Sequence, residues 1–505
     1  MKRATATGLV TLIVALLLAV PGAAGPRPKR GTVAPVLLVS RPWPPVVTVR
    51  VHVASGALVD PPGKEGLALL AWTLALRGAG SRDRGQFAEA LDSLGASVDA
   101  SVDRYVAALV GAAPVAELPA LLGLMADVLH SPRFDAEEFS KVRQQLVDDL
   151  LHLRDDEEAL VHDAIGRYVF RGTVLGRPGQ GTEQSLKRLD VADVQAFWHK
   201  NIANASLRFG LAGALTQAQA QAAVQGAFAS VGTDHPASPP PIGKIAVQGR
   251  RMLLLDKPRK AQAQIVLAWP TVGAQHKDAV AMAVANAILG GAFTSRLTHE
   301  IRELRGWAYH TWSALGSGPT VSSWALGFGT SAQDAAPAVD VAIQILQEMH
   351  EQGVTPQELR FAKDFLKGGQ RYALETAAME LAVRMRAADM GLPASDVDYW
   401  PQRIESVDLK TVNRVLHERM QPDHLAAVVV GTASQLLGPL QSGRSQFGVE
   451  VKPADSAPEA TTMPGQIVGK RPPPVLEEAP RADQDAEPMS EPPEEGDPED
   501  AEDAP

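Results

Sequence analysis

The feature that most constrains the fold of this chain is a segment that occurs twice, at an offset of 218 residues. Residues 189–213 (LDVADVQAFWHKNIANASLRFGLAG) align without a gap with residues 407–431 (VDLKTVNRVLHERMQPDHLAAVVVG). The matched positions include Asp190 with Asp408, His199 with His417, Leu207 with Leu425, and Gly213 with Gly431. Each copy has the pattern of an amphipathic helix that begins after an Asp, followed by a strand that ends at Gly. At the same offset, the strand pattern of residues 46–54 meets residues 262–270 to within two residues.

This repeat predicts two homologous domains of the α+β class, related by internal duplication, each an antiparallel sheet covered by helices. The length agrees, because 505 residues are too many for one hydrophobic core, and 45% apolar with 21% charged residues is ordinary globular composition. The Pro-rich stretch 232–244 (GTDHPASPPPIGK) predicts a linker. The N-terminal domain is then expected at residues 32–231 and the C-terminal domain at residues 245–450.

The N-terminal residues have the order of a secretory signal peptide, which we place at residues 1–24. Lys2 and Arg3 precede the apolar run 8–20, and small residues follow as far as Ala24. The run is shorter than the roughly 18 apolar residues that cross a bilayer. We expect cleavage after about Ala24, with an uncleaved anchor as the alternative, and no membrane span in the mature chain. With no Cys for disulfides or lipid attachment, the chain is expected to be exported, as a periplasmic or secreted protein.

The other end of the chain is strongly acidic. Residues 451–505 contain 15 Asp and Glu against 4 Lys and Arg, a net charge of −11, whereas the whole chain carries −10. This segment also holds 12 of the 38 prolines, so it is predicted to be a disordered tail. The other 450 residues sum to about +1, and their basic residues are not clustered, so no nucleic-acid partner is expected.

The first half contains the stretch GALVDPPGKEGLALLAWTLALRGAG, residues 56–80. A turn-rich loop leads to a helix beginning at about Glu65, and residues 67–76 are apolar almost all round, which predicts a buried helix. Together with LDSLGASVDASVDRY (91–105), LMADVLHSPRF (124–134) and GTEQSLKRLDVADVQAFW (181–198), this stretch resembles the N-terminal half of the insulinase or pitrilysin-type peptidases, the inverted zincins. The resemblance covers nearly all of residues 34–440 and implies that the two domains enclose a chamber.

In active relatives the buried helix carries the motif H-x-x-E-H, in which two His bind Zn²⁺ and the Glu activates water. The three matching positions here are Leu69, Trp72 and Thr73, and none can do either. The family's third ligand would fall at about Asp148 or Asp149, but one carboxylate is far from the three protein ligands that a catalytic zinc needs. We therefore predict no catalytic residue and no metal site in this chain.

Other chemistries find little support in the sequence. Asp155, Glu158 and His162 lie at helical spacing, and a solvated helix face is the favoured interpretation over a replacement metal site. Serine-hydrolase and phosphate-binding motifs are absent from the sequence.

The second half contains GGAFTSRLTHEIRELRGWAYHTWSAL, residues 290–315. It predicts a helix from about Thr294, as its cap, to Gly306, followed by a strand that pairs back with residues 320–330 as a hairpin. The stretch resembles the family's C-terminal signature, an Arg and a Tyr separated by six residues, here Arg302 and Tyr309. The resemblance implies a substrate-binding role: Arg holds substrate carbonyls and Tyr donates to the oxyanion of the tetrahedral intermediate. Taken alone, the pair also fits a helix-end Arg and an edge-packing Tyr.

In some family members the zinc motif and the Arg–Tyr pair are divided between two polypeptides. This sequence resembles the chain that lacks the metal. The leading hypothesis is a non-catalytic subunit of a heteromeric zinc peptidase, with Zn²⁺ in the partner subunit and a peptide as substrate. The peptide is expected to pair along an exposed sheet edge. The alternatives are a stand-alone envelope peptide-binding or scaffold protein, and an active zinc peptidase with unusual ligands.

Overall fold

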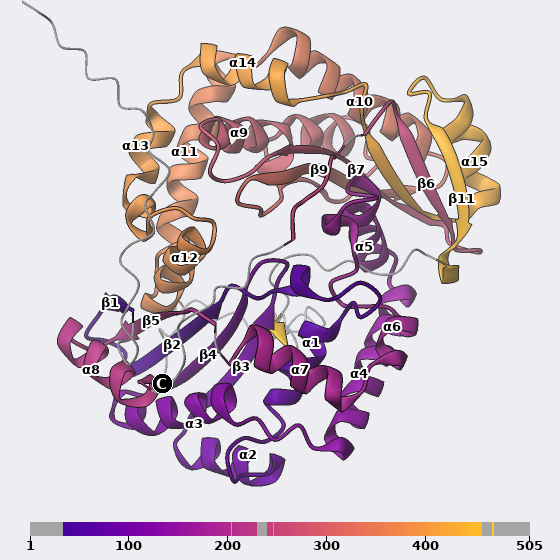
Figure 1. Ribbon diagram of the computed structural model, residues 1–505. Coiled ribbons are helices and arrows are strands. Elements are labelled where there is room, and N and C mark those ends of the chain that lie inside the picture. Colours follow the sequence, from indigo (N-terminus) through magenta and orange to yellow (C-terminus); the bar gives the residue numbers. More distant parts are fainter. Residues whose placement is uncertain (1–33, 204, 230–239, 246, 457–466, 469–505) are drawn as a thin grey trace, which may run out of the picture. The chain divides into compact units, whose positions relative to one another are not determined.

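The computed structural model describes residues 34–203, 205–229, 240–245, 247–456 and 467–468, and Figure 1 shows how their helices and strands are arranged. The predicted signal peptide, most of the predicted linker and most of the predicted acidic tail lie outside these residues. Of the linker, residues 240–244 are described, and they form neither helix nor strand. Within the described ranges, no helix has both the length and the hydropathy that crossing a membrane requires.

The first half builds a sheet with helices packed on it. Its strands are β1 (Leu37–Ser40), β2 (Val46–Val53), β3 (Ser97–Val102), β4 (Ala107–Pro114) and β5 (Leu207–Gly213). Its helices are α1 (Leu67–Ala75), α2 (Arg84–Ser93), α3 (Leu118–His130), α4 (Ala136–Asp155), α5 (Glu157–Val169), α6 (Glu183–Arg188), α7 (Val191–Asn201) and α8 (Gln217–Phe228), with short turns η1 (Ala57–Val59), η2 (Val115–Glu117) and η3 (Val174–Gly176). The alternation of Val47, Val49, Val51 and Val53 buries one side of β2 beneath α1, α3 and α7.

The second half repeats this plan. Its strands are β6 (Arg251–Asp256), β7 (Gln262–Val272), β8 (Thr311–Leu315), β9 (Val321–Ser331), β10 (Ala426–Gly431) and β11 (Gly448–Pro453). Its helices are α9 (Ala279–Asn286), α10 (Ala335–Gln352), α11 (Pro356–Ala373), α12 (Ala377–Asp389), α13 (Trp400–Glu405), α14 (Leu409–Arg419) and α15 (Ala433–Ser442), with π-helical η4 (Ala287–Gly291) and η5 (Thr298–Glu303) and the 3-10 turns η6 (Ala394–Tyr399) and η7 (Ala454–Ser456). The predicted hairpin of β8 and β9 is confirmed, since the two strands pair antiparallel.

The two sheets share one topology, which confirms the fold class and the duplication. The order β1-β5-β2-β4-β3 of the first sheet corresponds strand for strand to β6-β10-β7-β9-β8 of the second. One detail of the prediction differs, because the sheets are mixed rather than purely antiparallel. β1 pairs parallel with β5, and β6 pairs parallel with both β10 and β11. A parallel pair requires a crossover connection, and the helical segments between these strands provide it.

The repeated segment of the sequence forms equivalent elements. α7 and α14 begin at residues 191 and 409, at the expected offset of 218. The side chain of Asp190 accepts a hydrogen bond from the backbone of Asp193, and Asp408 accepts one from Thr411. These N-caps satisfy an amide that would otherwise be unpaired at the first turn, so the same residue starts the same helix twice.

In each half, one helix packs against the sheet of the other half. α5 packs its buried residues Leu160, Val161, Ala164 and Ile165 against β6, β7 and β10 of the second sheet. In return, Leu381 and Met385 of α12 pack on Val39 and Ala212 of the first sheet. Gly210 of β5 makes this approach possible, because a Cβ there would lie 2.7 Å from Leu381 Cδ1 and 2.8 Å from Met385 Sδ.

The C-terminal boundary differs from the prediction. β11 continues to Pro453 and η7 spans Ala454–Ser456, although the disordered tail was expected from residue 451. Further along, β12 (Ile467–Val468) pairs antiparallel with β3, with Ile467 opposite Ser101 and Val468 opposite Ala100. The acidic, Pro-rich composition of residues 451–505 gave no sign of these short strands, whose backbones pair with strands of the two sheets.

Candidate functional site

The helix that corresponds to the zinc motif, α1, begins at a tight junction. Gly66 has a left-handed backbone (φ 88°), and a Cβ there would lie 2.7 Å from the Gln180 carbonyl oxygen, so only glycine fits. The buried Asp60 carboxylate accepts hydrogen bonds from the amides of Gly66 and Ala68, each 2.8 Å long. Burial raises the pKa of Asp60 to about 8, although these two hydrogen bonds act in the opposite direction.

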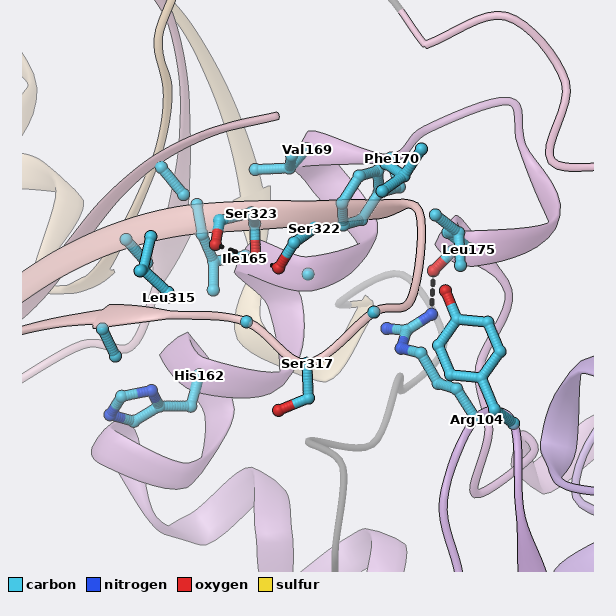
Figure 2. A pocket seen from close by; sticks show the side chains of 18 of the residues that line it. Arg104, His162, Ile165, Val169, Phe170, Leu175, Leu315, Ser317, Ser322 and Ser323 are labelled. Atoms are coloured by element: carbon cyan, nitrogen blue, oxygen red, sulfur yellow. Dashed lines mark hydrogen bonds between the residues drawn. The ribbon is translucent and has the colours of Figure 1, made fainter. Parts of the chain in front are cut away.

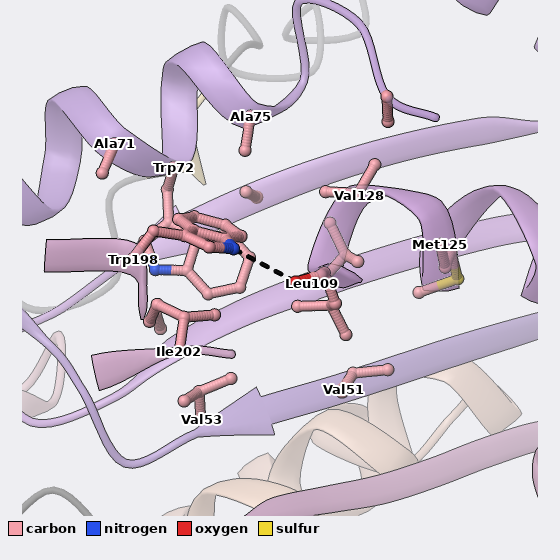
Figure 3. Packing of buried hydrophobic residues seen from close by; sticks show 14 of the residues in the cluster. Val51, Val53, Ala71, Trp72, Ala75, Leu109, Met125, Val128, Trp198 and Ile202 are labelled. Carbon is pink, nitrogen blue, oxygen red and sulfur yellow. Dashed lines mark hydrogen bonds between the residues drawn. The ribbon is translucent and has the colours of Figure 1, made fainter. Parts of the chain in front are cut away.

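The expectation of a buried helix is confirmed, because every residue of α1 except Leu69 is buried. Figure 3 shows Trp72 pointing into the cluster beneath α1, where its ring meets Trp198 edge to face with centroids 4.9 Å apart. Trp198 in turn donates to the Leu129 carbonyl (3.1 Å), whereas the Trp72 indole nitrogen is buried without a hydrogen-bond partner. The indole of Trp72 thus acts as hydrocarbon packing in the position that would hold the water-activating Glu.

The other two motif positions are also closed to metal chemistry. Leu69 is partly buried and packs against the same cluster. The hydroxyl of Thr73 donates to the Leu69 carbonyl (2.8 Å), one turn earlier in the helix. Asp148 accepts a hydrogen bond from Gln144, and Asp149 is exposed on α4. Among the described residues, no three His, Cys, Asp or Glu side chains lie together in a way that could hold an ion.

Arg302 and Tyr309 lie together in the second half. The Arg302 guanidinium carbon lies 5.3 Å from the centre of the Tyr309 ring and 4.8 Å from that of Phe293. These distances are those of cation–π contacts, which hold the charged group in place while leaving its N–H donors available. Tyr309 is 87% exposed, so its hydroxyl faces solvent.

The local structure that brings the pair together differs from the predicted helix. The helical segment starts at Arg296 rather than at Thr294, and it continues as the π-helix η5, in which Arg302 occupies the last turn. Gly306 then adopts the predicted left-handed conformation (φ 65°), with its amide donating to the Arg302 carbonyl (3.0 Å). Tyr309 precedes β8 by two residues instead of opening it. A π-helix carries an extra residue per turn, which the sequence pattern does not reveal.

Buried hydroxyl groups tie this helix to β8. Thr298 of η5 is within hydrogen-bond distance of Ser295 and of Thr311 of β8, with oxygen separations of 3.0 Å in both cases. All three residues are buried. The helix that carries Arg302 and the strand that follows Tyr309 are therefore held in a fixed relation by hydrogen bonds between their side chains.

A groove of about 370 Å³ lies beside Tyr309. Its lining is mostly polar and comes from α5, β7, β9 and the residues next to β8 and α10, including Glu158, His162, Gln264, His310, Thr330 and Asp334. His162 stacks on Trp312 with ring centroids 4.8 Å apart, and burial lowers the pKa of His162. The sequence interpretation placed His162 on a solvated helix face. His162 instead lines this groove, because α5 packs on the sheet of the second half.

Comparisons with known proteins agree with this geometry. A family model described as insulinase (peptidase family M16) matches residues 35–183, and one described as peptidase M16 inactive domain matches residues 188–366. Together they match nearly all of residues 35–366, which include most of the first half and part of the second. The chain belongs to the insulinase family.

Relatives of this insulinase-family chain are found in bacteria. An uncharacterized zinc protease of Mycobacterium tuberculosis is 26% identical over 433 residues, which cover 84% of this chain and 96% of the relative. A Helicobacter pylori relative named as a non-peptidase homolog is 24% identical over 306 residues, 60% of this chain and 70% of the relative. A solved peptidase M16 inactive domain from Pseudomonas fluorescens has a TM-score of 0.72 and 21% identity, covering 79% of this chain and 97% of that one. With Leu69, Trp72 and Thr73 at the motif positions, the chain is an insulinase-type member of the inactive kind.

Proposed function

We propose that this chain is the non-catalytic, substrate-binding subunit of a heteromeric zinc peptidase. A zinc-bearing relative with an intact H-x-x-E-H motif supplies the metal and the general base. This chain supplies Arg302 and Tyr309 to the partner's site, where peptide hydrolysis takes place. The observation that carries the proposal is the Arg302–Tyr309 pair itself, held by cation–π contact and facing solvent.

The pair has the chemistry that a peptidase needs beside its metal. A Tyr hydroxyl donates to the oxyanion that forms when water attacks a peptide carbonyl, and such a donor commonly contributes a factor of roughly 10²–10³ to the rate. A guanidinium group offers a fork of donors for substrate carbonyls. No carboxylate among the described residues forms an ion pair with Arg302, so these donors are not engaged by a structural partner.

Peptide binding along a sheet edge has support from the edge of β3. There the chain's own β12 is added as an antiparallel strand, which indicates that this edge accepts extended backbone. The outer edge of β8 is less available, because Asn286 donates to the Ser313 carbonyl (3.2 Å). Because β12 occupies the β3 edge, we propose that an extended peptide binds there in place of β12, with little sequence preference, since backbone hydrogen bonds do not read side chains.

The test is to purify the chain together with a partner that carries H-x-x-E-H and to measure cleavage of a fluorogenic peptide. Tyr309→Phe removes one hydroxyl, and we expect kcat/KM of the complex to fall by about tenfold or more. Tyr372→Phe is the matched control, because Tyr372 is also highly exposed (73%) but lies on α11. Unaltered cleavage with Tyr309→Phe would remove the proposal.

A stand-alone envelope peptide-binding or scaffold protein is the second candidate, and the retained Arg302 and Tyr309 argue against it. Gel filtration and pull-down from native extract separate the two functions. If the chain is a subunit, the pull-down recovers an equal amount of a peptidase-like chain. If it is a stand-alone scaffold, it elutes alone in gel filtration. We further propose that the chain is exported, because residues 1–24 have the order of a signal peptide, and that its domains meet at the linker of residues 232–244.

A further inference from the structure

A second cavity, distinct from the groove beside Tyr309, lies on the other side of the His162–Trp312 stack. Its volume is about 180 Å³, and α5, β8, β9 and the turn between β3 and β4 form its walls. Most of the lining is apolar and includes Ile165, Val169, Phe170, Leu315, Val321 and Ala325. A dry apolar cavity of roughly 150 Å³ is enough to hold benzene, so this one has room for a phenyl ring or a branched alkyl group.

The cationic side chain of Arg104 lines one end of this cavity. Figure 2 shows Arg104 extending from the turn between β3 and β4 towards Leu175, whose carbonyl accepts a hydrogen bond from the guanidinium. That is a neutral acceptor, and no carboxylate of the described residues forms an ion pair with Arg104. Burial lowers the pKa of Arg104 to about 10, with the charges of Tyr105, Asp163 and Asp103 acting in the opposite direction. The carboxylates of Asp103 and Asp163 act on Arg104 from beyond ion-pair distance, so a carboxylate bound directly to the guanidinium would offset the cost of burying its charge.

The cavity is built by both halves of the chain. Tyr105 packs against the tip of the β8–β9 hairpin. A Cβ added at Gly318 would lie 3.2 Å from the Tyr105 hydroxyl oxygen. The Arg104 side chain also lies close to α5, since a Cβ at Gly166 would be 3.4 Å from its Nη2, at van der Waals contact. The exchange of α5 between the halves therefore produces the cavity, and neither half has all of its walls.

We propose that this cavity binds a carboxylate with an apolar body, with the carboxylate on Arg104 and the phenyl or branched alkyl group among the side chains of α5 and β9. Two sources share this chemistry: the C-terminal apolar residue of a peptide, and a free aryl or alkyl carboxylic acid. The inference concerns the isolated chain and does not depend on a partner subunit, so it stands or fails separately from the proposed function.

The experiment is calorimetric titration of the full-length chain with hydrocinnamate and with hydrocinnamyl alcohol, which has the same body without the charge. We expect one site for hydrocinnamate and binding of the alcohol weaker by about ten- to hundredfold, the usual difference for a charge-assisted hydrogen bond. Arg104→Met should weaken hydrocinnamate to the level of the alcohol. Arg171→Met is the matched control, because the Arg171 side chain is 61% exposed and lies outside the cavity.

A second variant guards against a misfolded Arg104→Met. Ala325→Leu fills the cavity from β9 without touching the cation and should abolish binding of both ligands. Equal affinity for acid and alcohol, unchanged binding in Ala325→Leu, or no binding of hydrocinnamate would overturn the proposal. The peptide Ala-Ala-Phe and its C-terminal amide then identify the source. Binding of the free-acid peptide alone assigns the cavity to peptide C-termini, and binding of neither peptide assigns it to small acids.

Discussion

At the scale of single residues, the motif helix is stabilised by the side chains that replaced the metal ligands. Trp72 is fully buried between α1 and α7, in edge-to-face contact with Trp198. Burying an indole in this way stabilises the fold by the area it removes from water and by aromatic contact. The position that would carry the general base of a peptidase has become part of the hydrophobic core.

Trp72→Ala is therefore expected to lower the free energy of unfolding by about 3–5 kcal/mol, because it leaves a cavity that the surrounding elements cannot close. Urea unfolding followed by circular dichroism measures the change. Tyr372→Ala is the control, since Tyr372 is exposed and its removal should change stability by less than about 0.5 kcal/mol. A loss as small as that of the control would show that Trp72 is not a core residue.

Asp60 gives a prediction for pH. Its pKa is raised by burial to about 8 in the folded chain, from an ordinary 3.8, so the folded state holds the proton more tightly than the unfolded state. The contribution of Asp60 to the free energy of unfolding is fully present below its ordinary pKa of 3.8. It declines as the pH rises towards 8, by at most about 1.4 kcal/mol per pH unit. Asp60→Asn should remove this decline.

Urea unfolding of the wild type and of Asp60→Asn, measured at several pH values between 3.8 and 8, gives the difference in their free energies of unfolding. Asp408→Asn is a control of opposite sign, because hydrogen bonds to Thr411 lower the pKa of Asp408. The Asp408 contribution is present at neutral pH and is lost as pH falls. A stability difference for Asp60→Asn that does not vary with pH would contradict the buried carboxyl group.

At the scale of elements, the sequence was informative where a pattern is local. The duplicated helix and strand, α7 with β5 and α14 with β10, follow from hydrophobic period and an Asp cap. The buried character of α1 follows from apolar residues on every side. The π-helix η5 was missed, because its extra residue leaves the same amphipathic pattern.

The sequence did not reveal which sheet each helix packs against, and this was the larger omission. The pattern of α5 indicates that one face is buried but not which sheet covers it, so the position of His162 beside the second sheet could not be predicted. The location of Arg302 and Tyr309 in neighbouring elements came from the family resemblance. The cation–π contacts of Arg302 with Tyr309 and with Phe293 came only from the structure.

The exchange of helices can be tested at Gly210. Gly210→Val should clash with Leu381 and Met385 of α12 and lower the free energy of unfolding by about 1–3 kcal/mol, as overpacking usually does. Adding Met385→Ala should recover part of that loss, because it makes room for the new side chain. A control is Gly226→Val in α8, where a Cβ would have no neighbour within 4 Å. Equal losses at both glycines would contradict close packing of α12 on β5.

At the scale of the whole molecule, the chain keeps the duplicated fold of the insulinase family while its motif helix carries no metal ligand. The Arg302–Tyr309 pair remains accessible in the second half, which is the basis for proposing a role beside a zinc-bearing partner. This account depends on the claim that the first half has lost the metal and that its site is filled by packing side chains.

The most direct test is the zinc content of the full-length chain, purified alone without chelators and measured by mass spectrometry of the metal. A catalytic zinc site needs about three protein ligands, and its absence predicts far less than one zinc per chain. About one tightly held zinc per chain, accompanied by peptide cleavage that a chelator abolishes, would contradict the account.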